Sequence, residues 1–321
     1  MNILVTGGAG FIASNFIRLI LQKKPDWKIT NLDKLTYCGN LNNLKDIENN
    51  PNYTFKQGDI CDEKIVNQIM KETDIVFHFA AESHVDNSIK DPFIFTKTNI
   101  IGTQTLLEAA RKHNIKKFIH VSTDEVYGSV HAGFSKENDP LEPNSPYSAS
   151  KTASDHIVRS YHVTFGVPTI ITRSSNNFGP YQFPEKLIPL FVTNLFEGKK
   201  VPLYGDGMNI RDWIYVIDNC EGILFAAENG KIGETYNIGG DNPYPNVKIT
   251  KLIIELTGKD ESSIEYVKDR PGHDRRYALD SSKLHALGWK PNHNFESALK
   301  ETIKWYKDNP NWWKPLKGKK E

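Results

Sequence analysis

The chain has 321 residues, 38% of them hydrophobic and 25% charged, and its 40 basic and 39 acidic residues leave a net charge of +1. These values are typical of a soluble globular protein, and they exclude a general electrostatic attraction to nucleic acid or to membranes. With three scattered cysteines (Cys38, Cys61 and Cys220), no evident leader and no apolar run long enough to span a bilayer, we expect a cytoplasmic protein without disulfides, membrane segment or metal site.

The first half of the chain alternates short β-rich runs with helical patterns. An apolar run at residues 3–5 predicts the first strand, and an apolar-periodic segment at 16–21 follows it. Further strands are predicted at residues 28–33, 53–60, 74–81, 116–123 and 168–175. A helix is predicted at 99–113. This alternation predicts a doubly wound parallel α/β sheet of the Rossmann type, with helices on both faces.

After Asn176 the chain is richer in Pro and Gly, and loops make up more of it. We therefore predict a Rossmann domain over residues 1–175 and a smaller mixed α/β domain over most of 176–321 that shapes a pocket. Two short strands, at 213–216 and 235–238, are expected to return to the first domain, so the boundary is not one clean cut.

A glycine turn links the first predicted strand to a helix. Gly7, Gly10 and Ala13 are spaced by three residues, as in turns that bring the backbone close to a pyrophosphate at a helix N-terminus. Any sharp strand–helix turn can use glycines, so the turn alone is weak evidence. Asp33 strengthens it, because a carboxylate at the end of the second strand can accept hydrogen bonds from a ribose 2′-hydroxyl and would repel a 2′-phosphate. The pattern favours NAD over NADP.

Tyr147 and Lys151 lie four residues apart in a segment whose helix start is marked by Ser145 and Pro146. That spacing places both side chains on one helical face, where a cation favours the phenolate form of tyrosine. The pair is common by chance. Beside an NAD turn and a strand that ends in Thr123, it indicates hydride-transfer chemistry at the carboxyl ends of the strands.

Asp124 and Glu125 follow Thr123 directly. A simple dehydrogenase needs one base, whereas two adjacent carboxylates at a strand end offer a second acid and base. Surface carboxylates on a loop are the alternative interpretation.

Several segments together resemble the extended short-chain dehydrogenase/reductase family, and within it the sugar-nucleotide 4,6-dehydratases. They are TGGAGFIASN (6–15), HFAAESHVD (78–86), STDEVYG (122–128), YSASK (147–151), RSSNNFGPYQFPEKLIP (173–189) and RPGHDRRYALD (270–280). The resemblance covers almost the whole chain and departs from the family at Ala13, where Gly is usual. It implies an NAD-dependent hydro-lyase that acts on dTDP-glucose in dTDP-rhamnose or other deoxysugar synthesis. It also implies a homodimer through helices at 99–113 and 149–165.

The resemblance also implies roles for the catalytic residues. Tyr147, supported by Lys151 and Thr123, takes the proton of the sugar C4 hydroxyl. Glu125 removes the C5 proton and Asp124 protonates the leaving C6 hydroxyl.

Further residues are expected to bind ligands because they match the motifs of the family. Those expected at the cofactor are Gly7, Gly10, Phe11, Ile12, Asp33, Lys34, Thr36, Asp59, Ile60, Ala80, Ala81, Thr98, Tyr147, Lys151 and Asn177. Those expected at the sugar nucleotide are Ser83, Thr123, Asn176, Lys186, Leu187, Pro202, Leu203, Tyr204, Arg211, Asn246, Arg270 and His273. An ion pair with Asp212 is the alternative for Arg211.

Three other functions are compatible with parts of this pattern. A UDP-hexose 4-epimerase would use Tyr147 and Lys151 but has no need for Asp124 and Glu125. A non-catalytic NAD-binding sensor would be free to lose Tyr147, Lys151 or Thr123, and all three are present. A UDP-uronate decarboxylase should require an extra cation for the substrate carboxylate. The choice between thymine and uracil depends on one methyl group and stays open.

Overall fold

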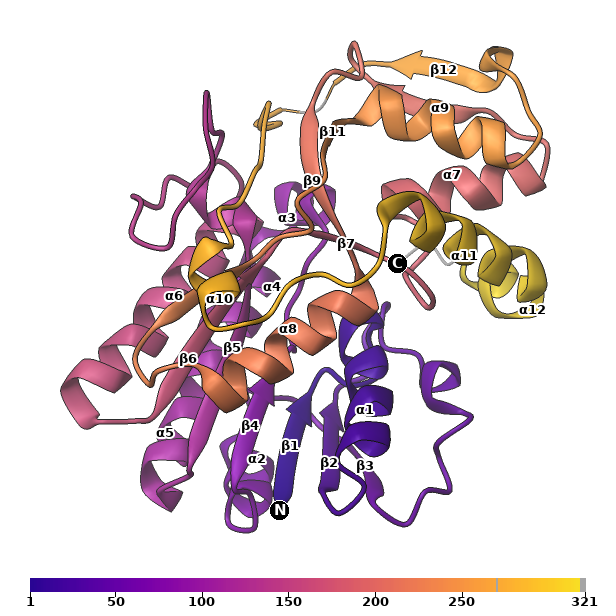
Figure 1. The fold of residues 1–321 in the computed structure, drawn as a ribbon. Helices are drawn as coiled ribbons and strands as arrows, with labels where there is room; N and C mark the ends of the chain where they lie inside the picture. The colour runs from indigo at the N-terminus through magenta and orange to yellow at the C-terminus, as the bar shows by residue number, and fades with distance from the viewer. Residues whose placement is uncertain (270, 318–321) are drawn as a thin grey trace.

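A parallel sheet of seven strands organises most of the first half of the chain (Figure 1). The structure, a computed structural model, describes residues 1–269 and 271–317. The strand order is β10-β6-β5-β4-β1-β2-β3, and all neighbouring pairs are parallel. The strands are β1 (Asn2–Thr6), β2 (Lys28–Asp33), β3 (Tyr53–Gln57), β4 (Ile75–His78), β5 (Lys117–Thr123), β6 (Thr169–Ser174) and β10 (Thr235–Ile238). The predicted doubly wound sheet is confirmed.

Helices cover both faces of this sheet, which is why its strands are apolar on both sides. The long helices are α1 (Phe11–Lys23), α2 (Glu63–Met70), α5 (Thr103–His113), α6 (Pro146–Phe165) and α8 (Val216–Asn229). In β1, Ile3 and Val5 join the core beneath α1 and α8, whereas Leu4 joins the core beneath α2, α5 and α6. The strand order reverses between β1 and β4, and ligands of such sheets bind at the carboxyl ends of the strands beside this point.

The helix predicted at 99–113 begins earlier and is not α-helical throughout. A π-helical turn precedes α5, and short helices precede that turn. These elements are α3 (Val85–Lys90), α4 (Pro92–Phe95) and η2 (Thr96–Gly102). The shorter 3-10 turns of the first half are η1 (Leu41–Leu44) and η3 (Asp124–Tyr127).

The second half of the chain adds two small sheets and their helices. One sheet has the order β11-β9-β7, and the other pairs β8 with β12. The elements are β7 (Asn176–Phe178), α7 (Leu187–Phe196), β8 (Val201–Tyr204), β9 (Ile210–Tyr215), β11 (Pro243–Pro245), α9 (Asn246–Leu256), η4 (Glu261–Ser263), β12 (Ile264–Val267), α10 (Ser282–Ala286), α11 (Phe295–Asp308), α12 (Pro310–Trp313) and η5 (Lys314–Leu316).

One of the two predicted returning strands is placed wrongly. Residues 235–238 join the large sheet as β10, which pairs with β6. Residues 213–215 belong to β9, which pairs with β7 and β11 in the three-stranded sheet, and Val216 begins α8. It is α8, rather than β9, that returns to the large sheet, where it packs on α1. The division of the chain at residues 175 and 176 stays a prediction.

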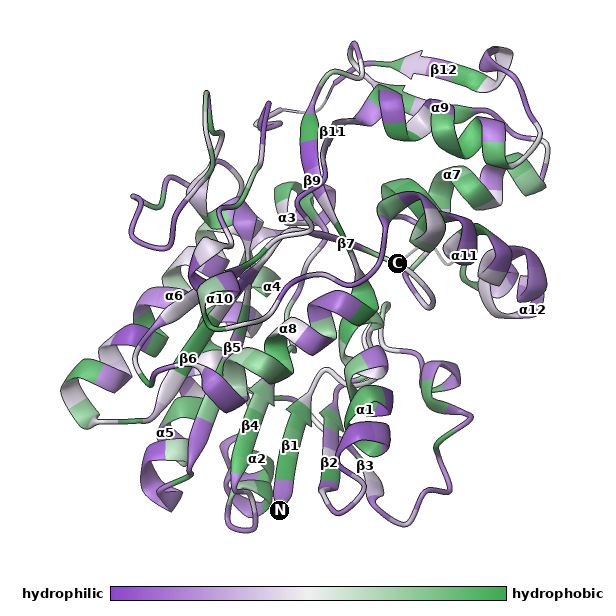
Figure 2. Cartoon of the chain, in the orientation of Figure 1, coloured by the Kyte–Doolittle hydropathy of each residue, from purple (hydrophilic) through white to green (hydrophobic). Residues whose placement is uncertain are grey.

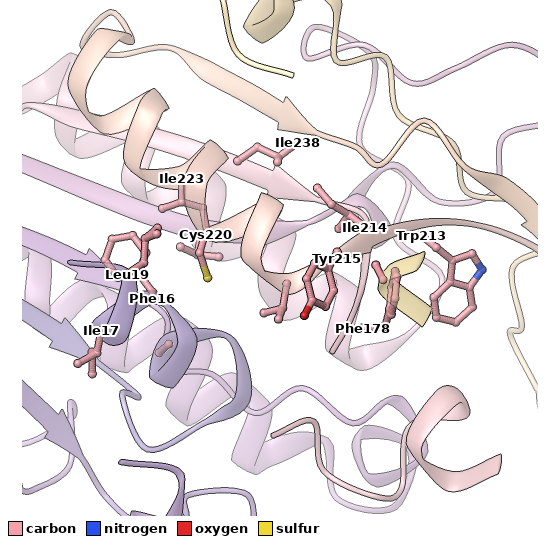
Figure 3. Packing of buried hydrophobic residues seen from close by; sticks show 14 of the residues in the cluster. Phe16, Ile17, Leu19, Phe178, Trp213, Ile214, Tyr215, Cys220, Ile223 and Ile238 are labelled. Atoms are coloured by element: carbon pink, nitrogen blue, oxygen red, sulfur yellow. The ribbon is translucent and has the colours of Figure 1, made fainter. Parts of the chain in front are cut away.

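A single apolar core connects the two halves (Figure 3). Phe16 of α1 and Ile223 of α8 lie in the same buried cluster as Trp213 of β9 and Phe178 of β7. A close-packed core resists displacement of one part relative to another. The small sheets are therefore held in a defined position relative to the glycine turn. Residues from both halves of the chain therefore pack in one core with α1.

Hydropathy follows this layered arrangement (Figure 2). The central strands β1 and β4 are mainly hydrophobic, and the outer faces of the helices are mainly hydrophilic. Within the described residues, no helix combines the length and the apolar character that crossing a membrane requires.

Candidate active site

A pocket opens at the carboxyl ends of β1 to β5, beside the point where the strand order reverses. Every residue predicted to bind the cofactor except Asn177 lines it. The lining members of that set are Gly7, Gly10, Phe11, Ile12, Asp33, Lys34, Thr36, Asp59, Ile60, Ala80, Ala81, Thr98, Tyr147 and Lys151. Residues that lie more than a hundred positions apart in the sequence thus share one cavity, which joins the glycine turn to the Tyr147 helix.

The glycine turn has the geometry of a phosphate cradle. Gly7 has a φ of +71°, and a Cβ atom there would lie 2.7 Å from the Cα atom of Ala80, so only glycine fits without a shift of the backbone. Gly10 is the N-cap residue of α1, and no side chain of the described residues caps this end. The uncapped N-terminus, with its unpaired N–H groups and positive dipole end, lines the pocket and suits an anion such as a diphosphate.

Asp33 ends β2 at the same pocket and is buried. Its Oδ2 atom accepts a hydrogen bond of 2.9 Å from the N–H of Ala9, and its Oδ1 atom accepts one of 2.8 Å from the N–H of Leu35. Burial raises the pKa of this carboxyl, and the two backbone bonds oppose that rise. Each carboxylate oxygen keeps lone pairs for further donors, so Asp33 fits the hydroxyls of a ribose. Two residues after the neighbouring strand β3, Asp59 pairs with Lys34 at 2.8 Å.

Tyr147 and Lys151 are both buried on the first turns of α6. A reciprocal capping box between Ser145 and Ser148, with Pro146 at the first helical position, starts this helix. The Nζ atom of Lys151 donates a 2.9 Å hydrogen bond to the carbonyl oxygen of Val121, and burial lowers the pKa of Lys151 to about 8.

The expected effect of Lys151 on Tyr147 is not the dominant one. Burial raises the pKa of Tyr147 above its usual range, the charge of Glu125 adds to the rise, and a hydrogen bond with Thr123 lowers it. Desolvation of the phenol is a property of the folded environment that the spacing of the two residues does not reveal. Ionising Tyr147 therefore depends on positive charge close to the ring.

Thr123, Asp124 and Glu125 occupy the end of β5 and the turn η3. The Thr123 hydroxyl donates to Asp124 Oδ1 at 3.2 Å and accepts from the N–H of Glu125 at 3.3 Å. Both carboxylates are close enough to Tyr147 to raise its pKa. The structure thus brings all five predicted catalytic residues together. Among the described residues of this set, Tyr147 and Lys151 line the cofactor pocket and the other three do not.

Asp124 has the environment of an acid. Its side chain is buried, and its Oδ2 atom has no hydrogen-bond partner within residues 1–269 and 271–317. Burial raises its pKa well above the usual range, Glu125 and Asp212 raise it further, and Arg211 opposes the rise. This rise in pKa favours the protonated form of Asp124, in which it can donate a proton.

Four of the residues predicted to bind substrate lie near the cofactor pocket or at the start of the second half. Ser83 and Lys186 line the pocket, and the Lys186 Nζ atom donates to the carbonyl oxygen of Ser83 at 3.2 Å. Leu187 begins α7. Asn176 is on β7 with Asn177, and the Oδ1 atoms of both are buried without a partner among the described residues. Such buried acceptors fit a ligand that donates hydrogen bonds.

Another group of these residues surrounds the small sheets. Pro202, Leu203 and Tyr204 form most of β8, and Asn246 begins α9. The rings of Tyr204 and His273 meet edge to face at 6.1 Å. Arg270 lies outside the described residues. None of the described members of this group lines the cofactor pocket.

Arg211, on β9, links this group to the catalytic carboxylates. Its guanidinium stacks 4.2 Å from the ring centroid of Tyr277 and donates to the carbonyl oxygen of Asp274 at 2.9 Å. Asp212, the alternative partner suggested by the sequence, accepts the N–H groups of Gly240 and Asn242. The charge of Arg211 affects the pKa of Asp124, so a phosphate held by this arginine would lie near the acids.

The sequence analysis missed part of the pocket wall. The lining residues that were not predicted include Asn40, Asn43, Tyr181, Gln182, Trp312 and Leu316. Tyr181 and Gln182 lie within the quoted segment 173–189, but no rule of spacing pointed to their side chains. Trp312 and Leu316 follow the glycine turn by about three hundred residues and carry no local motif.

The comparisons with known proteins agree with one another. The model of the family described as GDP-mannose 4,6 dehydratase matches residues 4–302. The dTDP-glucose 4,6-dehydratase of Streptomyces antibioticus is 50% identical over 323 residues, which cover 99% of this chain and 96% of that protein. A crystal structure of the dTDP-glucose 4,6-dehydratase of Streptomyces venezuelae, with NAD bound, has a TM-score of 0.97 and 48% identity, and covers 98% of this chain and 100% of its own.

The same fold also carries a different reaction. A UDP-glucuronic acid 4-epimerase of Bacillus cereus, in complex with UDP-glucuronic acid and NAD, has a TM-score of 0.91 at 30% identity. The match covers 96% of this chain and 99% of the epimerase. Because the fold is common to both, the residues of the site have to decide the chemistry.

Proposed function

The chain belongs to the GDP-mannose 4,6 dehydratase family, and from that premise we propose that it is an NAD-dependent dTDP-glucose 4,6-dehydratase. The enzyme removes one water from dTDP-glucose and gives dTDP-4-keto-6-deoxyglucose, a precursor of dTDP-rhamnose and other deoxysugars. The observation that carries this function is the placement of Asp124 and Glu125 beside Tyr147. Oxidation and reduction at C4 need one base, whereas elimination of water needs a second base and an acid.

The nucleotide base is assigned from the relatives rather than from the family model. The family description names GDP-mannose, but the proteins about half identical to this chain over nearly its full length are dTDP-glucose 4,6-dehydratases. We propose that the residues of β8, the start of α9 and His273 surround the base. Arg211 then contacts the diphosphate, for which a buried guanidinium is well shaped.

The residues of the large sheet fit NAD. Asp33 holds the adenosine ribose, and the uncapped N-terminus of α1 after Gly7 and Gly10 holds the diphosphate. When bound, NAD supplies the acceptor and donor of a hydride. The pocket runs from this turn to Tyr147 and Lys151, so it brings the nicotinamide end to the catalytic residues.

Tyr147 is the base of the oxidation. It accepts the proton of the C4 hydroxyl, while the Thr123 hydroxyl, already hydrogen-bonded to it, holds the same oxygen. Burial opposes the phenolate form, so this step needs positive charge nearby. Lys151, one helical turn along α6, is the cation that the fold places at this end of β5.

Glu125 and Asp124 carry out the elimination. A ketone at C4 makes the C5 proton acidic, and Glu125 removes it. Asp124, protonated because it is buried, gives its proton to the C6 hydroxyl, the C6–O bond breaks and water leaves. A hydride returns to C6 and Glu125 gives its proton back to C5. The cofactor ends in its starting state, whereas Tyr147 ends with the C4 proton and Asp124 ends without its own, so one proton passes from Tyr147 to Asp124 before the next turnover.

We also propose that the protein is a cytoplasmic homodimer. The three cysteines are all free, as in a reducing compartment. The helical layer of η2, α5 and α6 exposes the apolar side chains of Ile101, Val163 and Phe165, which a second copy would cover. Size-exclusion chromatography with light scattering tests this, and a monomer at micromolar concentration would contradict it.

The function is tested by incubating the purified protein with dTDP-glucose without added NAD, followed by mass spectrometry of the product. Loss of one water is expected, because the cofactor is regenerated and stays bound. A product of unchanged mass inverted at C4 would instead indicate an epimerase. A protein that binds NAD but leaves dTDP- and UDP-sugars unchanged, with or without added cofactor, would be a sensor.

A further inference from the structure

The last described segment of the chain lies against the cofactor pocket. Trp312 of α12 and Leu316 of η5 line the same cavity as Gly7, Gly10 and Asp33. Leu316 is buried and Trp312 is partly buried. The pocket wall is therefore completed by residues that follow the glycine turn by about three hundred positions, and no part of the reaction described above uses them.

A chain of hydrogen bonds connects Trp312 to the glycine turn. The indole Nε1 atom donates to Asn43 Oδ1 at 2.8 Å, and the Asn43 Nδ2 atom donates to the carbonyl oxygen of Ala9 at 2.8 Å. The N–H of Asn40 donates to the same oxygen at 3.0 Å. Ala9 lies between Gly7 and Gly10, and its own N–H donates to Asp33. The indole, the loop around Asn43 and the turn that faces the diphosphate thus form one connected unit.

Aromatic packing holds the indole on its other side. The ring of Trp312 lies 5.0 Å from that of Trp305 and 5.8 Å from that of Tyr181, both in edge-to-face geometry. The guanidinium of Arg18 stacks 4.3 Å from the Tyr181 ring, and Arg18 also bonds Asp46 with its Nε atom at 2.8 Å. Nearby, the hydroxyl of Tyr306 donates to the carbonyl oxygen of Gln182, a pocket residue. The segment is therefore fixed over the pocket from both halves of the chain.

We propose that Trp312 is a positioning residue whose role is to retain NAD. We name Trp312, Leu316, Asn43 and Tyr181 the C-terminal clasp. A dinucleotide in the pocket lies against this clasp, and a path past it opens only when the Trp312–Asn43 bond and the ring contacts break. The inference rests on the proposed function, in which the hydride returns to the same sugar and a cofactor lost in mid-cycle would leave the reaction incomplete.

The test measures cofactor release rather than turnover. Wild type, Trp312→Phe and Trp312→Ala are loaded with NAD, separated from free nucleotide and mixed with an excess of a thionicotinamide analogue, and released NAD is followed by chromatography. Trp312→Phe keeps a ring but loses the donor to Asn43, so release should be roughly threefold to tenfold faster, as loss of one hydrogen bond implies. Trp312→Ala should be faster still. Trp289→Phe is the matched control, because it alters a buried indole that does not line the pocket, and its release should equal that of wild type.

A second comparison separates the clasp from general packing. If the bond to Asn43 transmits the effect, Trp312→Phe should add little to the release rate of an Asn43→Ala protein. Unchanged release in both Trp312 variants, with unfolding midpoints equal to that of wild type, would overturn the clasp and leave the proposed function intact. Equal acceleration by Trp289→Phe would overturn it as well. A wild-type protein that neither holds nor binds NAD would instead overturn the proposed function, and the clasp with it.

Discussion

The buried ammonium of Lys151 donates a hydrogen bond of 2.9 Å to the backbone carbonyl oxygen of Val121. This bond ties α6 to β5 two residues before Thr123. Tyr147, one helical turn earlier than Lys151, is thereby held at the strand end where Thr123, Asp124 and Glu125 lie. The side chain of Lys151 thus supplies the cation for the chemistry and also links α6 to β5, the two elements that carry the catalytic residues.

Lys151 is expected to reduce stability in exchange for activity. Its folded pKa of about 8 lies below its unfolded value of 10.5, so the unfolded state binds the proton more tightly. The penalty is complete below pH 8 and disappears as the pH rises to 10.5. It amounts to about 3 kcal/mol. A variant without the ammonium regains only part of this free energy, because it leaves the Val121 carbonyl oxygen without its donor. Lys151→Met should therefore lose activity by about 100-fold or more, while its stability relative to wild type is highest at neutral pH.

Urea unfolding of both proteins without cofactor, from neutral pH to pH 10.5, measures this difference. The stability of wild type should rise relative to that of Lys151→Met across the upper part of this range. A difference that is independent of pH would show that burial of the ammonium does not destabilise the fold.

Substitutions of Asp124 and Glu125 are expected to block different steps of the reaction. Glu125→Gln should prevent exchange of the C5 hydrogen with deuterated solvent. Asp124→Asn should allow that exchange but slow water loss, by about 100-fold to 10,000-fold for removal of a general acid. Mass spectrometry of the sugar nucleotide distinguishes an added deuteron from a lost water. Equal loss of exchange in both variants would contradict the separate roles.

Deprotonation of Asp124 should produce the alkaline limb in the pH profile of the rate of water loss. Its raised pKa extends the protonated form to higher pH, and the proton donor is lost as the pH rises through that pKa. The rate of water loss should fall on that side in wild type. In Asp124→Asn, the residual rate should not show this limb.

Gly7 offers a test of the phosphate cradle. Gly7→Ala places a side chain at a φ of +71° and 2.7 Å from the Cα atom of Ala80. Gly166→Ala is the matched control, since its φ is +69° but nothing lies within 4 Å of the added atom. The control should lose about 1–2 kcal/mol of stability from backbone strain alone. Gly7→Ala should lose more and should also lose bound NAD, as measured by urea unfolding and by the nucleotide content of the purified protein.

Asp33→Asn is expected to weaken NAD binding by about 10-fold to 100-fold. The amide group would present a donor to one of the two backbone N–H groups that the carboxylate now accepts, and it would lose a charged acceptor for the ribose. Asp74→Asn is the control, because Asp74 pairs with Lys116 just before β4 and does not line the pocket. Titration calorimetry with NAD should show a large loss for the first variant and a small one for the second.

The sequence predicts the large sheet well and the small sheets poorly. Strands such as residues 74–81 are recognisable because a short β-rich run between helical patterns has few other interpretations. For residues 213–215, local β-propensity indicates a strand but not its partner, and pairing with β7 and β11 is decided by contacts far along the chain. Residues 235–238 illustrate the opposite outcome, since the expected return to the large sheet is confirmed.

The parts of the site that were predicted depend on interactions over a few residues, and the parts that were missed depend on contacts between distant residues. The glycine turn, Asp33 and the Tyr147–Lys151 pair are visible in the sequence because turn chemistry and helical spacing act over a few residues. Trp312 and Asn43 are 269 positions apart and form one hydrogen bond, and no local rule links them. The raised pKa of Tyr147 was missed for a related reason, because burial is a property of the folded environment and not of the segment.

The late arrival of α8 and β10 has a consequence for synthesis of the protein. α8 packs on α1, and β10 forms the edge of the sheet beside β6, so about 240 residues must leave the ribosome before the first helix meets its partner. Contacts of such sequence separation form slowly, and until then the side of α1 that packs on α8 stays uncovered. The nascent chain should therefore depend on chaperones over a long part of its translation. A chain that stops before residue 216 should accumulate as aggregate rather than as a folded half.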